Sequence, residues 1–210
     1  MIKLYYAPGG CSLAPHIALE EAGAEFEAVR LDFQSAEQRG PGYLAINPKG
    51  RVPALVTDQG VLTECVAILA WIAQQWPRAG LAPLDDPWAF AQMQSFNAYL
   101  ASSVHVAYAH VSRPGRYADG EDAAAAMRAK APEALDGLFA LIEAQLSDGR
   151  PWVHGDRYTV SDPYLFVMTG WVYGRELLDP EATPFLRRHR ERVAARPAVL
   201  RVLEREARAA

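Results

Sequence analysis

Three segments of the sequence carry groups that could act as a nucleophile or bind a peptide ligand. The first is Cys11, which follows the turn Pro8-Gly9-Gly10 and precedes apolar residues with helical spacing. A thiol at a helix N-terminus has a lowered pKa, because the helix dipole stabilises the nucleophilic thiolate. Taken by itself, Cys11 is equally consistent with an inert buried thiol.

The second segment is the dipeptide Val52-Pro53. Proline lacks a backbone N–H and keeps the residue before it extended, so we expect Val52 at an open sheet edge. There its N–H and C=O groups could pair with an extended peptide by strand addition. A lone Val-Pro has a simpler explanation, in which the proline only protects the sheet edge.

The third segment is Thr63-Glu64-Cys65, which opens a helix. The exposed amides of a helix N-terminus suit a carboxylate ligand, and the Glu64 carboxylate suits an ammonium group. An amino acid head group carries both charges, so this helix start matches the N-terminal residue of a peptide. Alone, Glu64 would more simply stabilise the helix dipole.

A histidine in the second half of the chain is a further candidate. Ala98, Ala101, Ser102 and His105 fall at i, i+3, i+4 and i+7, which puts small side chains and one histidine on one helix face. Such a face suits the wall of a cleft. Close packing against another helix would explain the same pattern.

The elements that must position these residues differ between the two halves. Residues 1–77 show strand alternation at 2–6 and 26–31, a hairpin over 52–63, and apolar helical spacing after residues 11 and 64. This order, β-α-β-α-β-β-α, predicts a small α/β domain with a mixed sheet, in which the first two strands pair in parallel. Residues 78–87 are rich in Pro, Gly and Asp and are expected to form a linker, and 88–210 to form an all-α bundle.

The composition limits the kinds of partner. The chain has 210 residues and a formal net charge of -4, so it lacks the basic excess of a nucleic-acid-binding protein. No apolar run approaches the roughly 20 residues that cross a bilayer. The N-terminus lacks the features of a secretion signal, and two cysteines are too few for a disulfide framework. We therefore expect a cytoplasmic protein with free thiols that binds a small molecule. We expect it to bind neither nucleic acid nor a membrane.

The sequence closely resembles the bacterial beta-class glutathione transferases in three segments, which follow the order and spacing of that family: residues 4–14, 47–55 and 62–68. Residues 156–165 resemble the helical-domain signature of the same superfamily. The resemblance covers essentially the whole chain. It implies a thioredoxin-like N-terminal domain with a cis bond before Pro53, and an α-helical C-terminal domain. It also implies a homodimer whose interface helps to complete the site, glutathione as co-substrate, and no metal.

The resemblance also implies a role for individual residues. Cys11 would lie beside the glutathione sulfur and form a mixed disulfide with it, Val52 would pair with the cysteinyl backbone, and Glu64 with the Cys65 amide would hold the γ-glutamyl end. The implied catalytic residues are Cys11, His105, Tyr6 and Ser12. The implied glutathione-binding residues are Cys11, Arg51, Val52, Pro53, Glu64, Cys65 and His105.

The expected function is conjugation of the glutathione thiolate to hydrophobic electrophiles, with thiol-disulfide exchange through Cys11 as a second mode. Four positions depart from many beta-class members: Ser35, Ala98 and Val106 replace Lys, Asn and Lys, and Cys65 replaces Ser or Gly. Loss of these polar partners would weaken or retune glutathione binding. The alternatives are a glutathione-dependent lyase, isomerase or dehalogenase, a non-catalytic binder of glutathione or apolar ligands, and a structural interaction module.

Overall fold

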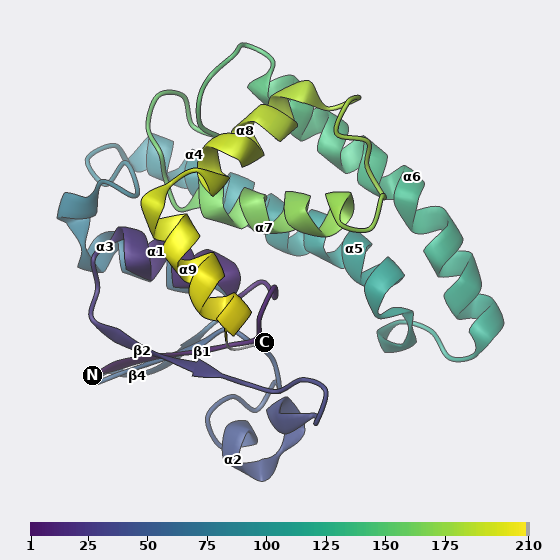
Figure 1. Ribbon diagram of the computed structural model, residues 1–210, viewed down its shortest axis with the longest axis horizontal. Helices are drawn as coiled ribbons and strands as arrows, with labels where there is room; N and C mark the ends of the chain where they lie inside the picture. The colour runs from purple at the N-terminus through teal and green to yellow at the C-terminus, as the bar shows by residue number, and fades with distance from the viewer. Residues whose placement is uncertain (209–210) are drawn as a thin grey trace.

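The computed structural model describes residues 1–208 and begins with a four-stranded mixed sheet (Figure 1). The strands are β1 (Ile2–Tyr6), β2 (Phe26–Arg30), β3 (Ala54–Thr57) and β4 (Gly60–Thr63), in the spatial order β2-β1-β3-β4. β1 and β2 are parallel, and β3 is antiparallel to both β1 and β4. The parallel pairing and the hairpin predicted from the sequence are therefore confirmed.

Helices complete the thioredoxin-like domain. They are α1 (Leu13–Glu21), α2 (Pro41–Leu44) and α3 (Cys65–Gln75), with short 3-10 turns η1 (Glu37–Arg39) and η2 (Pro77–Ala79). α1 and α3 pack against each other between the sheet and the second domain (Figure 1). Their apolar residues Ile17, Leu19, Ile68 and Ile72 are fully buried, which explains the predicted helical spacing.

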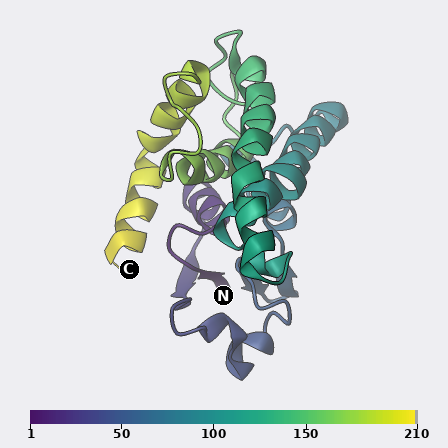
Figure 2. The ribbon, with the colours of Figure 1, turned by 90° about the vertical axis from the view of Figure 1, so that its right-hand side faces the viewer.

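In the described residues, the second domain is built from helices joined by loops, one of which carries two isolated β-bridges. Its helices are α4 (Pro87–Tyr99), α5 (His105–Ser112), α6 (Glu121–Leu146), α7 (Ser161–Tyr173), α8 (Pro184–Ala194) and α9 (Pro197–Arg208), with a 3-10 turn η4 (Pro114–Arg116). Figure 2 shows α8 and α9 along one side of this domain and α4, α5 and α6 along the other. The boundaries proposed from sequence at residues 77 and 88 stay a prediction, although α4 begins at Pro87.

The central helix α7 is anchored by a buried carboxylate. Residues 161–169 are all buried, and Asp162 accepts hydrogen bonds from the backbone N–H groups of Val153 (2.9 Å) and Thr159 (2.7 Å). The Thr159 hydroxyl in turn accepts from the Ser161 N–H at 3.3 Å. These two reciprocal hydrogen bonds fix the start of α7. α7 packs on α1, so the helix that follows Cys11 rests on the second domain.

The helix expected to continue through residues 90–105 contains a π-helical segment, η3 (Leu100–Val104), between α4 and α5. A π turn adds a residue to the helix, so side chains spaced at i, i+3, i+4 and i+7 no longer share one face. Ala101 and His105 accordingly line a cavity, whereas Ala98 and Ser102 are exposed and do not. The predicted small-residue wall is therefore wrong for half of its members.

Candidate active site

Cys11 lies in a loop that both domains hold. The loop leads from β1 into α1, and the Cys11 thiol donates to the Val52 carbonyl at 3.3 Å. From the helical domain, Trp171 on α7 donates its indole N–H to the Gly9 carbonyl at 2.8 Å. The Glu206 carboxylate on α9 accepts the Gly9 N–H at 3.0 Å and contacts His16 on α1 at 2.8 Å. Contacts from both domains therefore hold the loop that carries the thiol.

The segment that ends at Val52 is held by the turn before it. The Tyr43 hydroxyl and the Asn47 side-chain amide both donate to the Arg51 carbonyl at 2.6 Å. Gly50 has φ +59, and a Cβ atom there would lie 3.1 Å from the Gln38 carbonyl, so glycine is required. The Val52-Pro53 peptide bond is cis, as the resemblance implied. Tyr43 and Asn47 were not among the residues predicted to form or position the site.

The sheet places Val52 differently from the sequence-based expectation. β3 is an interior strand, paired on both sides from Ala54 onward. Pro53 precedes the first paired residue, so its missing N–H removes no ladder hydrogen bond. The backbone available to an extended peptide is thus the segment before the strand rather than an edge along it.

Glu64 stands between β4 and α3 in an uncommon backbone conformation, φ 73 and ψ 127. Its exposed carboxylate pairs with the Lys49 ammonium at 2.5 Å, and Lys49 also donates to the Thr63 hydroxyl at 3.0 Å. No side chain caps the amides at the start of α3. Non-glycine residues at positive φ are rare and concentrate at ligand sites. Lys49 was not among the predicted site residues.

Two adjoining cavities bring most of the predicted residues together. The smaller, of about 150 Å³, is lined by the start of α3 and includes Cys11, Arg51, Val52, Pro53, Glu64, Cys65 and His105. The larger, of about 510 Å³, extends from the same thiol toward α5 and α7. Cys11, Arg51, Val52 and His105 line both. All of the expected glutathione-binding residues therefore surround one continuous site.

Tyr6 and Ser12, expected from the resemblance to act near the sulfur, line neither cavity. Tyr6 is buried against His16, with ring centroids 5.0 Å apart, and burial raises the pKa of its phenol. The buried Ser12 hydroxyl accepts the Ala7 N–H at 3.1 Å and donates to the Ala7 carbonyl at 3.2 Å. Ser12 thus folds the loop around Cys11 instead of facing a ligand.

The two cysteines form an asymmetric pair. A hydrogen bond with the Cys65 side chain is the largest cause that lowers the pKa of Cys11, and the positive charge of Arg113 adds to it, while burial opposes both. The same hydrogen bond and burial raise the pKa of Cys65 well above its usual value. The Cys65 thiol also approaches the Cys11 carbonyl at 3.5 Å. Cys11 is therefore the more acidic thiol of the pair.

His105 is a neutral imidazole at physiological pH. Burial, followed by the positive charges of Arg113 and Arg51, lowers the pKa of His105 to about 4. Its ring lies edge-on to Trp171 with the centroids 4.9 Å apart. A neutral imidazole can donate one hydrogen bond and accept another, which suits a partner for a thiol or thiolate. Val106, at one of the departing positions, lines the smaller cavity, whereas Ser35 is exposed and bonds to the Asp32 carbonyl.

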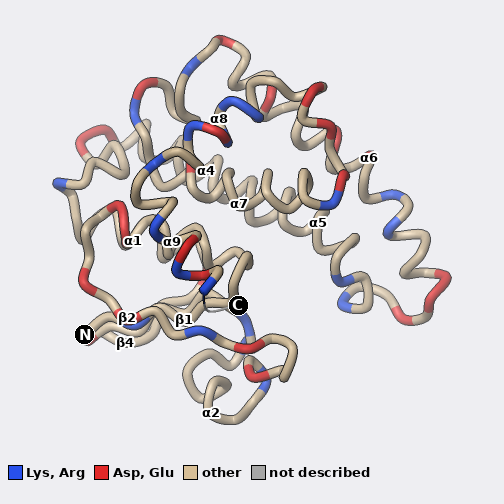
Figure 3. Tube along the Cα trace, viewed as in Figure 1, with Lys and Arg blue, Asp and Glu red and all other residues tan. Residues whose placement is uncertain are grey.

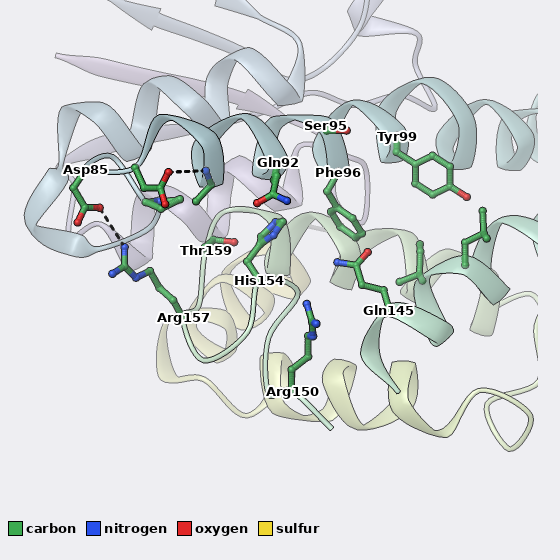
Figure 4. A pocket seen from close by; sticks show the side chains of 15 residues that line it. Asp85, Gln92, Ser95, Phe96, Tyr99, Gln145, Arg150, His154, Arg157 and Thr159 are labelled. Carbon is green, nitrogen blue, oxygen red and sulfur yellow. Dashed lines mark hydrogen bonds and ion pairs between the residues drawn. The ribbon is translucent and has the colours of Figure 1, made fainter. Parts of the chain in front are cut away.

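A third cavity, of about 910 Å³, is larger than both but lies away from the cysteines (Figure 4). It opens between α4, α6 and the loop before α7, and Phe96, Gln145 and His154 line it. Its charged groups are already engaged: Arg150 bonds to Asp148, and Arg157 lies 3.8 Å from Asp85. The candidate active site is therefore assigned to the two smaller cavities, because they contain Cys11 and this one does not.

Metal-binding and membrane-spanning features were sought in residues 1–208. This part of the chain holds no cluster of three or more His, Cys, Asp or Glu side chains placed to bind a metal ion. None of its helices combines the length and the apolar character required to cross a membrane.

A thioredoxin-like domain with a cysteine at a helix start, joined to a helical domain that closes the cavity, defines a class of two-domain proteins built to hold a peptide thiol. Residues 1–74 match the family model of the glutathione S-transferase N-terminal domain, and residues 98–197 that of the C-terminal domain. The chain belongs to the glutathione S-transferase family.

Individual relatives agree with this assignment over nearly the full chain. Glutathione S-transferase GstA of Escherichia coli O157:H7 is 35% identical over 98% of each chain. A glutathione transferase homologue from Sulfitobacter, solved with bound glutathione, is 42% identical, with a TM-score of 0.92 over 98% of each chain. The beta-class enzyme of Sphingomonas chungbukensis is 38% identical, with a TM-score of 0.85 over 97% of this chain and 98% of that one. The resemblance inferred from the sequence motifs is thereby confirmed.

Proposed function

We propose that this protein is a glutathione transferase that activates the thiol of glutathione beside Cys11 and lets it attack an electrophile in the larger cavity. The observation that carries the proposal is the junction of the two cavities at Cys11, Val52 and His105. One compartment has the shape and polar groups for a peptide, and the other has the room for a second substrate. Both open onto the same sulfur.

Glutathione would lie extended along the segment 51–53. Its γ-glutamyl carboxylate would accept from the uncapped amides at the start of α3, and its ammonium would pair with the Glu64 carboxylate. In that complex Lys49 would give up part of its contact with Glu64, which is exposed and therefore easily exchanged. The Val52 backbone would pair with the cysteinyl residue, which brings its sulfur toward Cys11.

Activation of glutathione requires stabilisation of negative charge on its sulfur, because the thiolate is the attacking species. The start of α1 supplies a positive dipole end, and Arg113 and Arg51 add positive charge to the cavity. Neutral His105 can donate a hydrogen bond to the developing thiolate. We assign Tyr6 and Ser12 a positioning role, because both contact the elements that hold the Cys11 loop.

Thiol-disulfide exchange is the second mode of the proposed activity. A Cys11 thiolate would attack a glutathione disulfide, forming a Cys11–glutathione mixed disulfide and releasing the other thiol. We expect Cys11→Ala to abolish both the mixed disulfide, detected by intact mass spectrometry, and the reduction of hydroxyethyl disulfide. An unchanged reduction rate would remove Cys11 from this reaction.

The proposal includes a homodimer and a cytoplasmic location. Homodimers are typical of the family, and two free cysteines fit a reducing compartment. Light scattering coupled to size-exclusion chromatography tests the assembly, for which we expect twice the 23.1 kDa mass of one chain.

The decisive experiment measures binding and turnover together. Titration calorimetry with glutathione, followed by initial rates with chlorodinitrobenzene and with hydroxyethyl disulfide, should show binding and at least one activity. Binding without turnover of any electrophile would instead support the non-catalytic binder, and absence of binding would support a structural module. A panel of halogenated, isomerisable and ether-linked substrates separates transferase from dehalogenase, isomerase and lyase.

A further inference from the structure

The larger cavity is unusually rich in arginine for a protein with a net charge of -4. Five arginines line it: Arg30, Arg51, Arg113, Arg116 and Arg175. Among the described residues, Asp32 supplies the only carboxylate on its wall, and this carboxylate accepts the backbone N–H of Gln34 at 2.9 Å. Figure 3 shows basic residues following the end of α5, where this wall begins. Within residues 1–208, none of the five arginines takes part in an ion pair.

The arginines divide between the two compartments. Arg51 and Arg116 line both cavities, and thus lie within reach of glutathione itself. Arg30, Arg113 and Arg175 line only the larger cavity, away from the start of α3. Glutathione brings one further carboxylate, on its glycine, which the shared pair can neutralise. The remaining arginines therefore face the second substrate.

Aromatic rings lie beside two of these arginines. Tyr108 and Trp171 are stacked, with centroids 4.9 Å apart and an interplanar angle of 21°. The Arg175 guanidinium lies 5.6 Å from the Tyr108 centroid, and Arg113 lies 5.8 Å from that of Phe33. Aromatic faces bind flat conjugated molecules, and a guanidinium held against a ring retains free N–H donors for a carboxylate.

The positive potential reaches the reacting centre. Arg113 and Arg51 both contribute to the low pKa of His105, and Arg113 also contributes to the lowered pKa of Cys11. Charges of one sign in a cleft raise the local concentration of an oppositely charged ligand more than the same charges on an open surface. An uncharged electrophile would gain nothing from this field.

We propose that the electrophile is a flat aromatic or conjugated molecule with a carboxylate or similar anionic group, bound by Arg113 and Arg175. This inference rests on the proposed function and narrows its expected substrate, a hydrophobic electrophile, to an anionic one. The ring lies against Tyr108 and Trp171, and the anion faces the guanidinium groups. The electrophilic carbon then points to the sulfur at the junction of the cavities.

The test reaction is nucleophilic aromatic substitution with a matched pair of substrates. 4-Chloro-3,5-dinitrobenzoate carries the anion, and 4-chloro-3,5-dinitrobenzamide has nearly the same shape without it. In both, the glutathione thiolate forms a C–S bond and chloride leaves with the electron pair of the C–Cl bond. After correction for the uncatalysed rates, we expect kcat/KM to favour the benzoate by roughly tenfold or more.

Three variants assign this preference to the arginines. Arg113→Gln and Arg175→Gln should each reduce the benzoate-to-amide ratio by about threefold to tenfold, and the double variant should bring it close to one. The matched control is Arg78→Gln, which removes an exposed arginine in η2 outside both cavities and should leave the ratio unchanged. Raising NaCl from about 20 mM to about 500 mM should also reduce the ratio, because salt screens exposed charges.

The outcomes separate the inference from the proposed function. If the arginines instead serve only the glycine carboxylate of glutathione, the variants will raise the KM for glutathione with the amide substrate and leave the ratio intact. An equal or higher kcat/KM for the amide in the unaltered protein overturns the inference while leaving the transferase function in place. If neither substrate is turned over although glutathione binds, the proposed transferase function itself fails.

Discussion

Cys11 and Cys65 differ in reactivity although their side chains touch. Cys11 is partly exposed at the junction of two cavities, and Cys65 is buried at the start of α3. The hydrogen bond between the two side chains lowers the pKa of Cys11, and the same bond, together with burial, raises the pKa of Cys65. A residue that departs from many relatives therefore supports the thiolate next to it.

Replacing Cys65 should make Cys11 less acidic. In Cys65→Ala the hydrogen-bond donor is lost, so the pKa of Cys11 rises and its alkylation by iodoacetamide requires a higher pH. The variant leaves Cys11 as the chain's only cysteine, which makes the measurement unambiguous. An unshifted alkylation profile would show that Cys65 has no influence on the thiolate.

Glu64 should dominate the recognition of the peptide head group. Glu64→Ala removes the charged partner of the ammonium and should raise the Kd for glutathione roughly tenfold, measured by calorimetry. Lys49→Ala is the informative companion, because it frees Glu64 without removing its charge. Equal affinity of Glu64→Ala and the unaltered protein would mean that the head group binds elsewhere.

His105 should make stability depend on pH. Its pKa is about 4 in the folded protein against about 6.5 when unfolded, so between these values only the unfolded chain takes up the proton. The free energy of unfolding should fall as the pH drops from 6.5 to 4, by up to about 3 kcal/mol from this group. Urea denaturation of His105→Gln should show a smaller fall. Parallel pH profiles would contradict the assignment.

At the scale of elements, α9 acts as a brace for the Cys11 loop. Glu206 on α9 accepts from Gly9 and contacts His16, and Arg201 on the same helix pairs with Glu20 on α1 at 2.6 Å. These contacts join α9, the last described helix, to α1, the first helix of the chain. Its packing face is buried, with Val199 and Val202 fully enclosed.

Removing the buried carboxylate of α9 should destabilise the fold. Glu206→Ala leaves the Gly9 N–H and the buried His16 without their partner, which should cost about 2 to 4 kcal/mol in the free energy of unfolding. Glu204→Ala is the control on the same helix, because Glu204 is exposed and, among residues 1–208, forms an ion pair only with Arg208. Its effect should stay within about 0.5 kcal/mol. Similar losses in both variants would argue against a specific role for Glu206.

The elements differ in how well the sequence predicts them. The strand-helix-strand start and the hairpin follow from local alternation and turn residues, which act over a few positions. The π turn at Leu100–Val104 does not, because residues 90–105 keep the apolar spacing of an ordinary helix and carry no local signal for an extra residue. The helical wall that includes Ala98 and Ser102 failed for that reason.

At the scale of the whole molecule, the thiol site combines local and distant parts of the chain. Cys11, Val52 and Glu64 could be assigned from motifs, because their backbone settings are local. Trp171 and Glu206 could not, since each reaches Gly9 across more than 160 positions of sequence. Tyr6 and Ser12 illustrate the opposite case: their sequence positions match the family, yet their side chains face the protein interior.

The two hydrogen bonds that Trp171 and Glu206 make with Gly9 form late in the synthesis of the chain. The ribosome completes residues 1–77 long before it adds Trp171 and Glu206, and domains begin to fold in this order. Until those residues are added, Gly9 lacks both hydrogen bonds, and only contacts within the thioredoxin-like half, such as that between Cys11 and Val52, are present to hold the loop.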